Sequence, residues 1–268
     1  MQFFDQLNQE IHLEKTPTRI VSLVPSQTEL LVDLGLEDSI IGITKFCVHP
    51  TYLKKQKTIV GGTKTINIEK IKALQPDIIL CNKEENTKEI VNLCQEIAPT
   101  HVSDIYTIQD TLTLIQQYGT LFSCTEKASK MIEDIQFKLN DFQQHTQDKK
   151  KLTAAYFIWR NPWMAAGNNN FINYLLDLNN FENMYGHKPR YPEVELKKIA
   201  SEGNPDLIFL SSEPYPFKEE HKTEIQQFAK KAKIIFVDGE MFSWYGSRLL
   251  KAFDYFKELQ NRIREISV

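Results

Sequence analysis

The sequence predicts an α/β protein of two lobes with mainly parallel sheets, joined by one long helix. Short β-branched runs such as Arg19–Val24 and Lys233–Val237 alternate with amphipathic stretches along the chain, which is typical of parallel sheets. The segment Gln75–Leu80 (QPDIIL) returns in the second half as Asn204–Phe209 (NPDLIF). Between the two copies, Ser123–Gln147 contains neither glycine nor proline, and its apolar residues recur at helical spacing.

Strands and helices alternate through the first half. Ser26 and Asn67 are suitable N-caps for two of the helices, and Gly35 is a suitable helix end. The predicted strands are Arg19–Val24, Ile40–Thr44, Pro76–Leu80 and Thr100–Ser103, and the predicted helices are Gln27–Leu34, Ile68–Leu74, Glu84–Ala98 and Ile108–Phe122.

The longest helix is predicted over Ser123–Gln147. Ser123 and Glu126 form a capping-box pattern, and Lys149–Lys151 supply the positive charge that suits a helix C-terminus. Such a helix is either a surface helix of a single domain or a rigid connection between two lobes. The repeated segment favours the connection, so we expect an N-terminal lobe over 1–122, a connecting helix over 123–150 and a C-terminal lobe over 151–268.

The second half repeats the alternation of the first. Each predicted strand is again followed by a helical stretch, which indicates a second parallel sheet. The predicted strands are Thr153–Ile158, Asn204–Leu210 and Lys233–Val237, and the predicted helices are Asn170–Leu178, Glu195–Ala200, Glu220–Lys231 and Ser247–Ile266.

Composition excludes several classes of protein. With 268 residues, 41% hydrophobic content and a net charge of -3, the chain is typical of globular proteins and gives no reason to expect nucleic-acid binding. Its four cysteines show no CxxC spacing, so neither structural zinc nor a disulfide framework is indicated. No apolar run approaches the ~20 residues of a membrane span. The first twenty residues lack the features of a secretory signal, which leaves a cytoplasmic location open.

Parallel sheets bind ligands beyond the carboxyl ends of their strands. All three tryptophans, Trp159, Trp163 and Trp244, lie on predicted loops at those ends. Aromatic walls with a few polar groups are typical of small-molecule sites, although each ring could simply fill a lobe. The candidate loops are Pro25–Gln27, Lys45–Pro50, Gly61–Thr65, Asn82–Asn86, Trp159–Asn169, Ser211–Phe217 and Gly239–Arg248.

Catalytic patterns are weak in comparison. The sequence has no GxSxG, GxxxxGK[ST] or GxGxxG motif. Cys47 and His49 place a thiol near an imidazole, as in a nucleophilic pair or half of a metal site. No third ligand is apparent. We therefore assign no catalytic residue and no metal, and keep a cytosolic enzyme or metal-binding protein using this pair as an alternative.

Three segments resemble a known family. Arg19–Leu30 (RIVSLVPSQTEL) resembles the opening strand, loop and helix of class III substrate-binding proteins, which serve ABC importers of vitamin B12, ferric siderophores and haem. Asn67–Leu80 resembles the family's N-x-E-x-I-x-x-L-x-P-D-x-I segment, and Asn161–Gly167 is similar to the loop that begins its C-terminal ligand wall. The resemblance covers about residues 17–265. It implies two Rossmann-like lobes joined by one rigid helix that allows movements of only a few degrees.

The resemblance also implies a function. The chain would be a non-catalytic monomer without a cofactor that captures a small molecule between its lobes and delivers it to an ABC permease. Its location would be periplasmic, or extracytoplasmic and membrane-anchored. Family members dock through one exposed carboxylate on each lobe. Glu69 matches the first, whereas the second position falls on Lys197 or Lys198, so Glu195 or Glu193 would have to substitute.

The ligand implied by the resemblance is a corrinoid such as cobalamin. Phe46 matches an aromatic position of B12-binding members and Glu240 lies near a cleft acid, but Thr63 and Asn82 stand where tryptophans are expected. A ferric siderophore is anionic and would favour several arginines at the site, but only Arg160 and Arg248 are candidates. A ferric-siderophore or haem receptor is therefore the alternative to a corrinoid receptor. A cytosolic corrinoid carrier on the same fold is a third option. The predicted ligand-binding residues are Phe46, His49, Trp159, Trp163, Glu240, Trp244, Tyr245 and Arg248.

Overall fold

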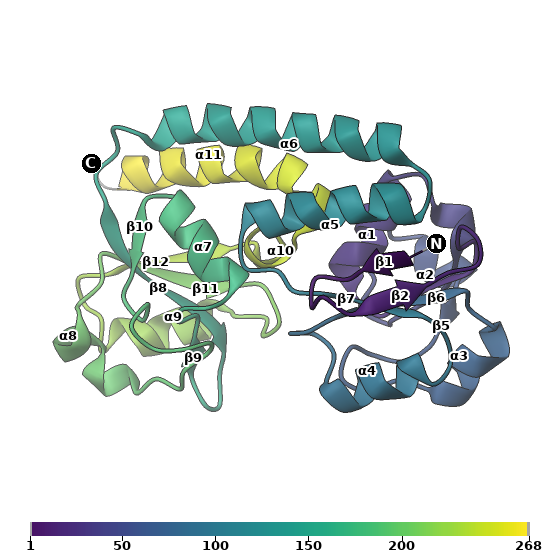
Figure 1. Cartoon of the computed structure of the whole chain (residues 1–268). Helices are drawn as coiled ribbons and strands as arrows, with labels where there is room; N and C mark the ends of the chain where they lie inside the picture. Colours follow the sequence, from purple (N-terminus) through teal and green to yellow (C-terminus); the bar gives the residue numbers. More distant parts are fainter. Residues whose placement is uncertain (1, 267–268) are drawn as a thin grey trace. The chain divides into compact units, whose positions relative to one another are not determined.

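The computed structural model describes residues 2–266 and divides them into two compact units (Figure 1). The N-terminal unit contains the residues up to Phe137 together with Trp244–Leu250, and the C-terminal unit contains Lys138–Ser243 and the residues from Lys251 onward. The chain therefore passes between the units three times, after Phe137, Ser243 and Leu250. The sequence indicated one passage, along the long helix. The predicted lobe boundaries at 122/123 and 150/151 stay predictions.

The N-terminal unit is built on a parallel sheet of order β5-β4-β3-β6-β7. Helices cover both faces, with α3 and α4 on one and α1 and α5 on the other (Figure 1). The strands are β3 (Ile20–Ser22), β4 (Ile40–Ile43), β5 (Thr58–Ile59), β6 (Ile78–Asn82) and β7 (Thr100–Ser103), and the helices are α1 (Pro25–Asp33), η1 (Glu37–Ser39), α2 (Leu53–Gln56), α3 (Ile68–Leu74), α4 (Lys88–Gln95) and α5 (Ile108–Leu121).

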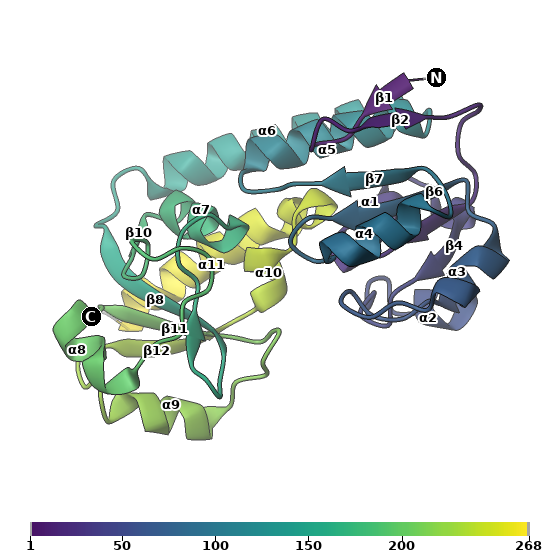
Figure 2. The same ribbon diagram turned by 60° about the horizontal axis from the view of Figure 1, so that its bottom comes forward.

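An antiparallel hairpin of β1 (Gln2–Phe4) and β2 (Glu10–His12) precedes this sheet and was not predicted (Figure 2). Asp5 Oδ2 accepts a hydrogen bond from the backbone N–H of Val102 in β7, at 3.2 Å. Its other oxygen accepts from Leu7 N and Gln9 N, each at 2.8 Å. One buried carboxylate thus shapes the hairpin turn and attaches it to the edge strand, which protects that edge from other chains.

The C-terminal unit has a second sheet, of order β10-β8-β11-β12, with β9 antiparallel to β8. Helices α8 and α9 cover one face, and α7, α10 and α11 the other (Figure 1). The strands are β8 (Leu152–Trp159), β9 (Met164–Ala165), β10 (Phe181–Asn183), β11 (Leu207–Ser211) and β12 (Lys233–Val237), and the helices are α7 (Phe171–Leu178), η2 (Leu196–Lys198), α8 (Ile199–Glu202), α9 (Glu219–Gln226) and α10 (Gly239–Ser243).

Two helices run through passages between the units. The long helix α6 (Thr125–Thr146) begins in the N-terminal unit, and α11 (Leu249–Ile266) follows the short helix η3 (Gly246–Arg248). In the C-terminal unit, Phe142 of α6 packs against the rings of α11 at 5.9 and 5.8 Å. No helix within residues 2–266 combines the length and apolarity needed to cross a bilayer.

The predicted α/β class with mainly parallel sheets is confirmed, and three predicted elements have the observed bounds: α3, β7 and β12. Two predicted helix caps are wrong. Ser26 lies inside α1, which begins at Pro25. Ser123 lies two residues before α6, has a φ of 54°, and shares a hydrogen bond with the Thr16 hydroxyl at 3.0 Å. Asn67 caps α3 as predicted, because its side chain accepts from Lys70 N at 2.9 Å.

The repeated Pro-Asp segment has the same local structure in both units. Gln75 and Asn204, which precede the proline, have left-handed φ angles of 47° and 45°. Asp77 Oδ2 accepts from Thr18 N at 2.9 Å and Arg19 N at 3.1 Å, just before β3. Asp206 Oδ2 accepts from Thr153 N of β8 at 2.9 Å. Each aspartate thus connects the start of its strand to the neighbouring strand.

Candidate functional site

Two groups of side chains lie at the carboxyl ends of the parallel strands, one group in each unit. We call Gln27, Glu29, His49, Trp244, Tyr245 and Arg248 the N-terminal cluster. We call Trp159, Arg160, Trp163, Tyr215, Phe217, His221 and Glu224 the C-terminal cluster.

A buried hydrogen-bond network forms the floor of the N-terminal cluster. Gln27 Nε2 donates to Tyr245 Oη at 2.9 Å and to Ser103 Oγ at 2.6 Å, and Gln27 Oε1 accepts from Tyr118 Oη at 2.7 Å. Burial raises the pKa of Tyr245 well above its usual value. The phenol therefore stays protonated, and the network ties Trp244–Leu250 to α1, β7 and α5.

An ion pair lies beside this network. Arg248 Nε donates to Glu29 Oε2 at 2.8 Å, and Arg248 is only 4% exposed. The Arg248 guanidinium lies 5.0 Å from the ring centroid of Trp244, a cation–π distance. On the same ring, His49 makes an edge contact at 5.5 Å. Trp244 is thus held by Arg248 and His49, and the arginine charge is paired with Glu29.

Phe46 projects further from the protein than the other predicted aromatics of this unit. It is 49% exposed, and the Lys45 ammonium lies 5.0 Å from its ring. The backbone of Gly62 packs closely against this ring, because a Cβ at that position would lie 3.0 Å from the Phe46 ring. An exposed ring on a backbone support is a suitable stacking surface for a flat ligand.

Asn82, where the resemblance would place a tryptophan, shapes a turn. Its Oδ1 accepts from Glu84 N at 2.9 Å and Glu85 N at 3.0 Å, while its amide donates to Ser103 Oγ at 2.9 Å. Asn86 then donates to the carbonyl of Thr63, the other such position, at 2.9 Å. This hydrogen-bonded turn delays α4 until Lys88, four residues after the predicted start of the helix.

The Cys47 thiol is buried and shares hydrogen bonds with Thr28 Oγ1 at 3.2 Å and Thr44 Oγ1 at 3.3 Å. Burial raises its pKa, which disfavours the thiolate that a nucleophile or metal ligand needs. The His49 ring is turned toward Trp244. Within residues 2–266, no group of three or more His, Cys, Asp or Glu side chains could hold a metal ion.

The C-terminal cluster is built from packed rings. Trp159, at the end of β8, is 40% exposed and meets the Tyr215 ring at 5.6 Å and 72°. Trp163 stacks on Phe217 at 5.5 Å and 11° and packs against the apolar core of the unit. Trp163 therefore supports the cluster from inside, whereas Trp159 presents a surface.

One carboxylate organises the polar side of this cluster. Glu224 accepts from Arg160 Nε at 3.0 Å and Nη2 at 2.9 Å, and from Trp163 Nε1 at 3.3 Å. The hydrogen bond to Glu224 is the main cause that raises the pKa of Arg160, and the Tyr215 hydroxyl adds a smaller contribution. The charge of Arg160 is thus matched by Glu224.

His221 connects this side to Tyr215. Its Nδ1 accepts the backbone N–H of Lys218 at 2.8 Å, and its Nε2 lies 3.1 Å from Tyr215 Oη. Tyr215 lies on a candidate loop but had no predicted role, and His221 and Glu224 lie in a predicted helix outside the candidate loops. No local sequence pattern marks His221 and Glu224 as site residues, because they contact the loop residues only through the packing of α9.

Glu240 lies in the first turn of α10, where its backbone N–H donates to Asp238 Oδ1 at 3.0 Å.

The two acids predicted to dock on the permease pair with neighbouring lysines. Glu69 of α3 is exposed and meets Lys72 at 3.2 Å. Glu195 accepts from Lys198 at 2.5 Å and meets Lys197 at 3.1 Å, and these hydrogen bonds lower its pKa.

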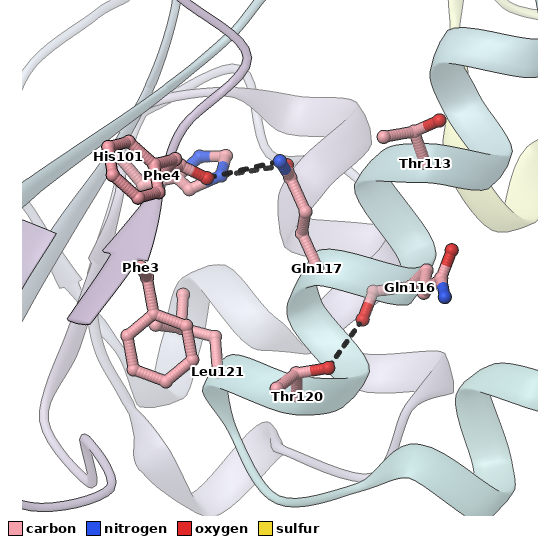
Figure 3. Close-up of a pocket in the computed structure, with 8 residues that line it drawn as sticks. All are labelled: Phe3, Phe4, His101, Thr113, Gln116, Gln117, Thr120 and Leu121. Carbon is pink, nitrogen blue, oxygen red and sulfur yellow. Dashed lines mark hydrogen bonds between the residues drawn. The ribbon is translucent and has the colours of Figure 1, made fainter. Parts of the chain in front are cut away.

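A cavity of about 280 Å³ lies elsewhere on the N-terminal unit (Figure 3). Gln117 joins two of its walls, since its Nε2 donates to the Phe4 carbonyl at 3.1 Å and its Oε1 lies 3.2 Å from His101 Nε2. Burial lowers the pKa of His101, so this ring is neutral. None of the residues predicted to bind a ligand lines this cavity. Its lining residues are Phe3, Phe4, His101, Thr113, Gln116, Gln117, Thr120 and Leu121.

Comparison with known proteins gives a consistent result. Residues 20–233 match the family described as periplasmic binding protein. An uncharacterized ABC transporter substrate-binding lipoprotein of Bacillus subtilis strain 168 is 25% identical, over 95% of this chain and 83% of its own. A vitamin B12-binding protein of Pectobacterium carotovorum is 25% identical, over 88% of this chain and 86% of its own. The crystal structure of the periplasmic vitamin B12-binding protein of Vibrio cholerae superimposes with a TM-score of 0.79 at 19% identity, covering 93% of this chain and 98% of that one.

Proposed function

The chain belongs to the periplasmic binding protein family, and from this premise we propose that it is the non-catalytic substrate-binding component of an ABC importer that captures a corrinoid. The relatives support this proposal, because one is named a substrate-binding lipoprotein and another a vitamin B12-binding protein. The protein would act outside the cytoplasm as a monomer without a cofactor, and an ABC permease would be its partner.

The pairing of the two arginines carries the choice of ligand. Arg160 and Arg248 are the two arginines on the candidate loops that a ferric catecholate siderophore could use, and each is already paired with a carboxylate. A strongly anionic ligand would have to compete with Glu224 and Glu29. A large, flat molecule of low net charge meets aromatic surfaces and neutralised arginines without that competition. A corrinoid is such a molecule, and a haem or ferric-siderophore receptor is the alternative.

Exposure divides the predicted ligand-binding residues into two roles. Phe46 and Trp159 are the exposed aromatics, so we assign them direct contact with the ligand. Trp163, Tyr245 and Arg248 are engaged in packing or hydrogen bonds, and we assign them to support of the contact surfaces. His49 and Trp244 of the N-terminal cluster, and Glu240 of α10 in the C-terminal unit, stay proposed ligand-binding residues without an assigned role.

For permease docking we propose Glu69, which projects from the first turn of α3 and has one exposed lysine partner. Glu195 is the weaker candidate, because two lysines surround its carboxylate. Replacement of Glu69 with alanine should leave ligand affinity intact and reduce only permease binding.

Calorimetry tests the ligand. Purified protein should bind cyanocobalamin at one to one, and Trp159→Ala should weaken binding roughly 5- to 150-fold, since loss of a stacked aromatic costs about 1–3 kcal/mol. Phe228→Ala is the matched control, because Phe228 belongs to the same unit, is also 40% exposed and lies outside the cluster. Absence of heat with any corrinoid, together with binding of haem or a ferric siderophore, would replace the ligand and keep the class.

A further inference from the structure

Tyr215 lies at the carboxyl end of the C-terminal sheet, on the loop that follows β11. Its ring packs against Trp159 at 5.6 Å and Phe217 at 4.9 Å. The side chain is only partly buried. These contacts fix the position of the Tyr215 ring beside the partly exposed indole of Trp159.

The backbone of α9 fixes the tautomer of His221. Because Lys218 N–H donates to His221 Nδ1 at 2.8 Å, that nitrogen must be an unprotonated acceptor in the neutral ring. The proton of the ring is therefore on Nε2, 3.1 Å from Tyr215 Oη. Glu220 Oε1 lies farther from this nitrogen, at 3.6 Å, on an exposed side chain. His221 Nε2–H thus donates to Tyr215, and the phenol oxygen accepts.

A phenol that accepts one hydrogen bond still has its own proton to donate. Arg160, the other group near this oxygen, has donors only. No acceptor for the Tyr215 proton is found in the part of the chain from residue 2 to residue 266. The Tyr215 hydroxyl is therefore oriented by its neighbours as a donor to something outside the protein.

Charge restricts what that acceptor can be. Arg160 and Glu224 neutralise each other 2.9 Å apart, so the surroundings of Tyr215 neither attract an anion strongly nor require one. A neutral carbonyl oxygen meets the phenol without opposing the Glu224 carboxylate. The rim of a corrinoid carries amide side chains whose carbonyl oxygens are such acceptors.

We propose that Tyr215 is a ligand-binding residue that donates its phenol hydrogen to an amide carbonyl on the ligand rim, beside the ring of Trp159. This inference rests on the proposed function. It adds a specificity-determining contact, since a ligand whose rim lacks an acceptor at this point would leave the phenol unpaired.

Tyr215→Phe tests the contact, because it removes the hydroxyl and keeps the ring. Loss of one neutral hydrogen bond should weaken cyanocobalamin binding roughly 2- to 13-fold in calorimetry. Tyr52→Phe is the control, since it removes the hydroxyl that donates to Glu37 at 2.7 Å on the N-terminal unit, and it should leave affinity unchanged. Dicyanocobinamide, which keeps the rim amides and lacks the nucleotide loop, should show the same loss with Tyr215→Phe.

The outcomes separate this inference from the proposed function. If wild-type protein binds cyanocobalamin and Tyr215→Phe binds it equally well, the inference fails alone. A loss that disappears with dicyanocobinamide would also overturn it, because the acceptor would then not be on the rim. Imidazole ¹⁵N NMR of ligand-free protein should show His221 protonated at Nε2, and protonation at Nδ1 alone would remove the basis of the inference. If no corrinoid binds to wild-type protein, the proposed function itself fails.

Discussion

The two clusters occupy equivalent positions in two similar sheets, but they are stabilised by different interactions. The N-terminal cluster is a buried polar network in which Gln27 bonds to two tyrosines and Arg248 pairs with Glu29. The C-terminal cluster is a set of packed rings with one ion pair at its partly exposed side. Substitutions at equivalent positions of the two clusters should therefore have different effects. Changes in the first cluster should act mainly on stability, and changes in the second mainly on ligand choice.

The largest effect is expected from Glu29→Gln. The substitution leaves the Arg248 charge buried without its carboxylate, and breaking a buried ion pair in this way costs about 3–5 kcal/mol. The free energy of unfolding, measured by urea denaturation with circular dichroism, should fall by that amount. Asp134→Asn is the control, because it breaks an exposed pair with Lys130 in the same unit, and such pairs contribute about 0–1 kcal/mol.

A further variant tests whether the loss of stability comes from the buried charge of Arg248 or from altered packing. Replacing Glu29 with leucine and Arg248 with methionine together removes both charges and keeps apolar volume, so much of the stability should return. If the double variant is as unstable as Glu29→Gln, packing in the N-terminal cluster, and not the loss of the Glu29 carboxylate beside the Arg248 charge, would be the cause.

The second effect concerns ligand selection by the C-terminal cluster. Glu224→Gln removes the charge that neutralises Arg160, so affinity for an anionic ferric catecholate should rise relative to cyanocobalamin by roughly tenfold, about 1.4 kcal/mol. Stability should change by only about 1 kcal/mol, since both side chains of the pair are partly exposed to solvent, which weakens their attraction. Tryptophan-fluorescence titration with both ligands measures the ratio. An unchanged ratio would show that the Arg160–Glu224 pair does not govern selection.

Sequence patterns predicted the sheets well because parallel strands are continuous apolar runs, which are local signals. The run Pro76–Leu80 indicated a strand that the structure places at Ile78–Asn82, and Lys233–Val237 was predicted with its observed bounds. The hairpin Gln2–His12 was missed, since it depends on Asp5 reaching Val102, far away in the sequence. The start of α4 was misplaced because Asn82 and Asn86 hold a turn through partners in β7 and the loop before α3.

The candidate site was predictable only in part, for a similar reason. Topology places Phe46, Trp159 and Trp244 at the carboxyl ends of strands, so their loops could be chosen from the sequence. Whether a side chain is exposed or paired depends on residues distant in sequence, such as Glu29 for Arg248 and Glu224 for Arg160. The proposed preference for a ligand of low charge therefore rests on the carboxylates that pair with the arginines, and these partners could not be recognised from the sequence.

The smallest effect is expected for the change in the protein's dimensions when the ligand binds. Two of the three passages between the units lie within or beside continuous helices, α6 and the start of α11. A helix has no extended hinge residues that could absorb a large backbone rotation. The radius of gyration from X-ray scattering should therefore change little between free and cyanocobalamin-bound protein.

Phe137 offers a sensitive control for this prediction. It is the last residue of the N-terminal unit before the passage along α6, and its side chain is 74% exposed. Phe137→Ala should behave like the wild type. Phe137→Pro removes a helical hydrogen bond, costs about 3 kcal/mol and introduces a kink, so it should produce a scattering change that the other two proteins lack. If the wild type changes on binding as much as Phe137→Pro does, the continuous helices do not restrict movement and the prediction is wrong.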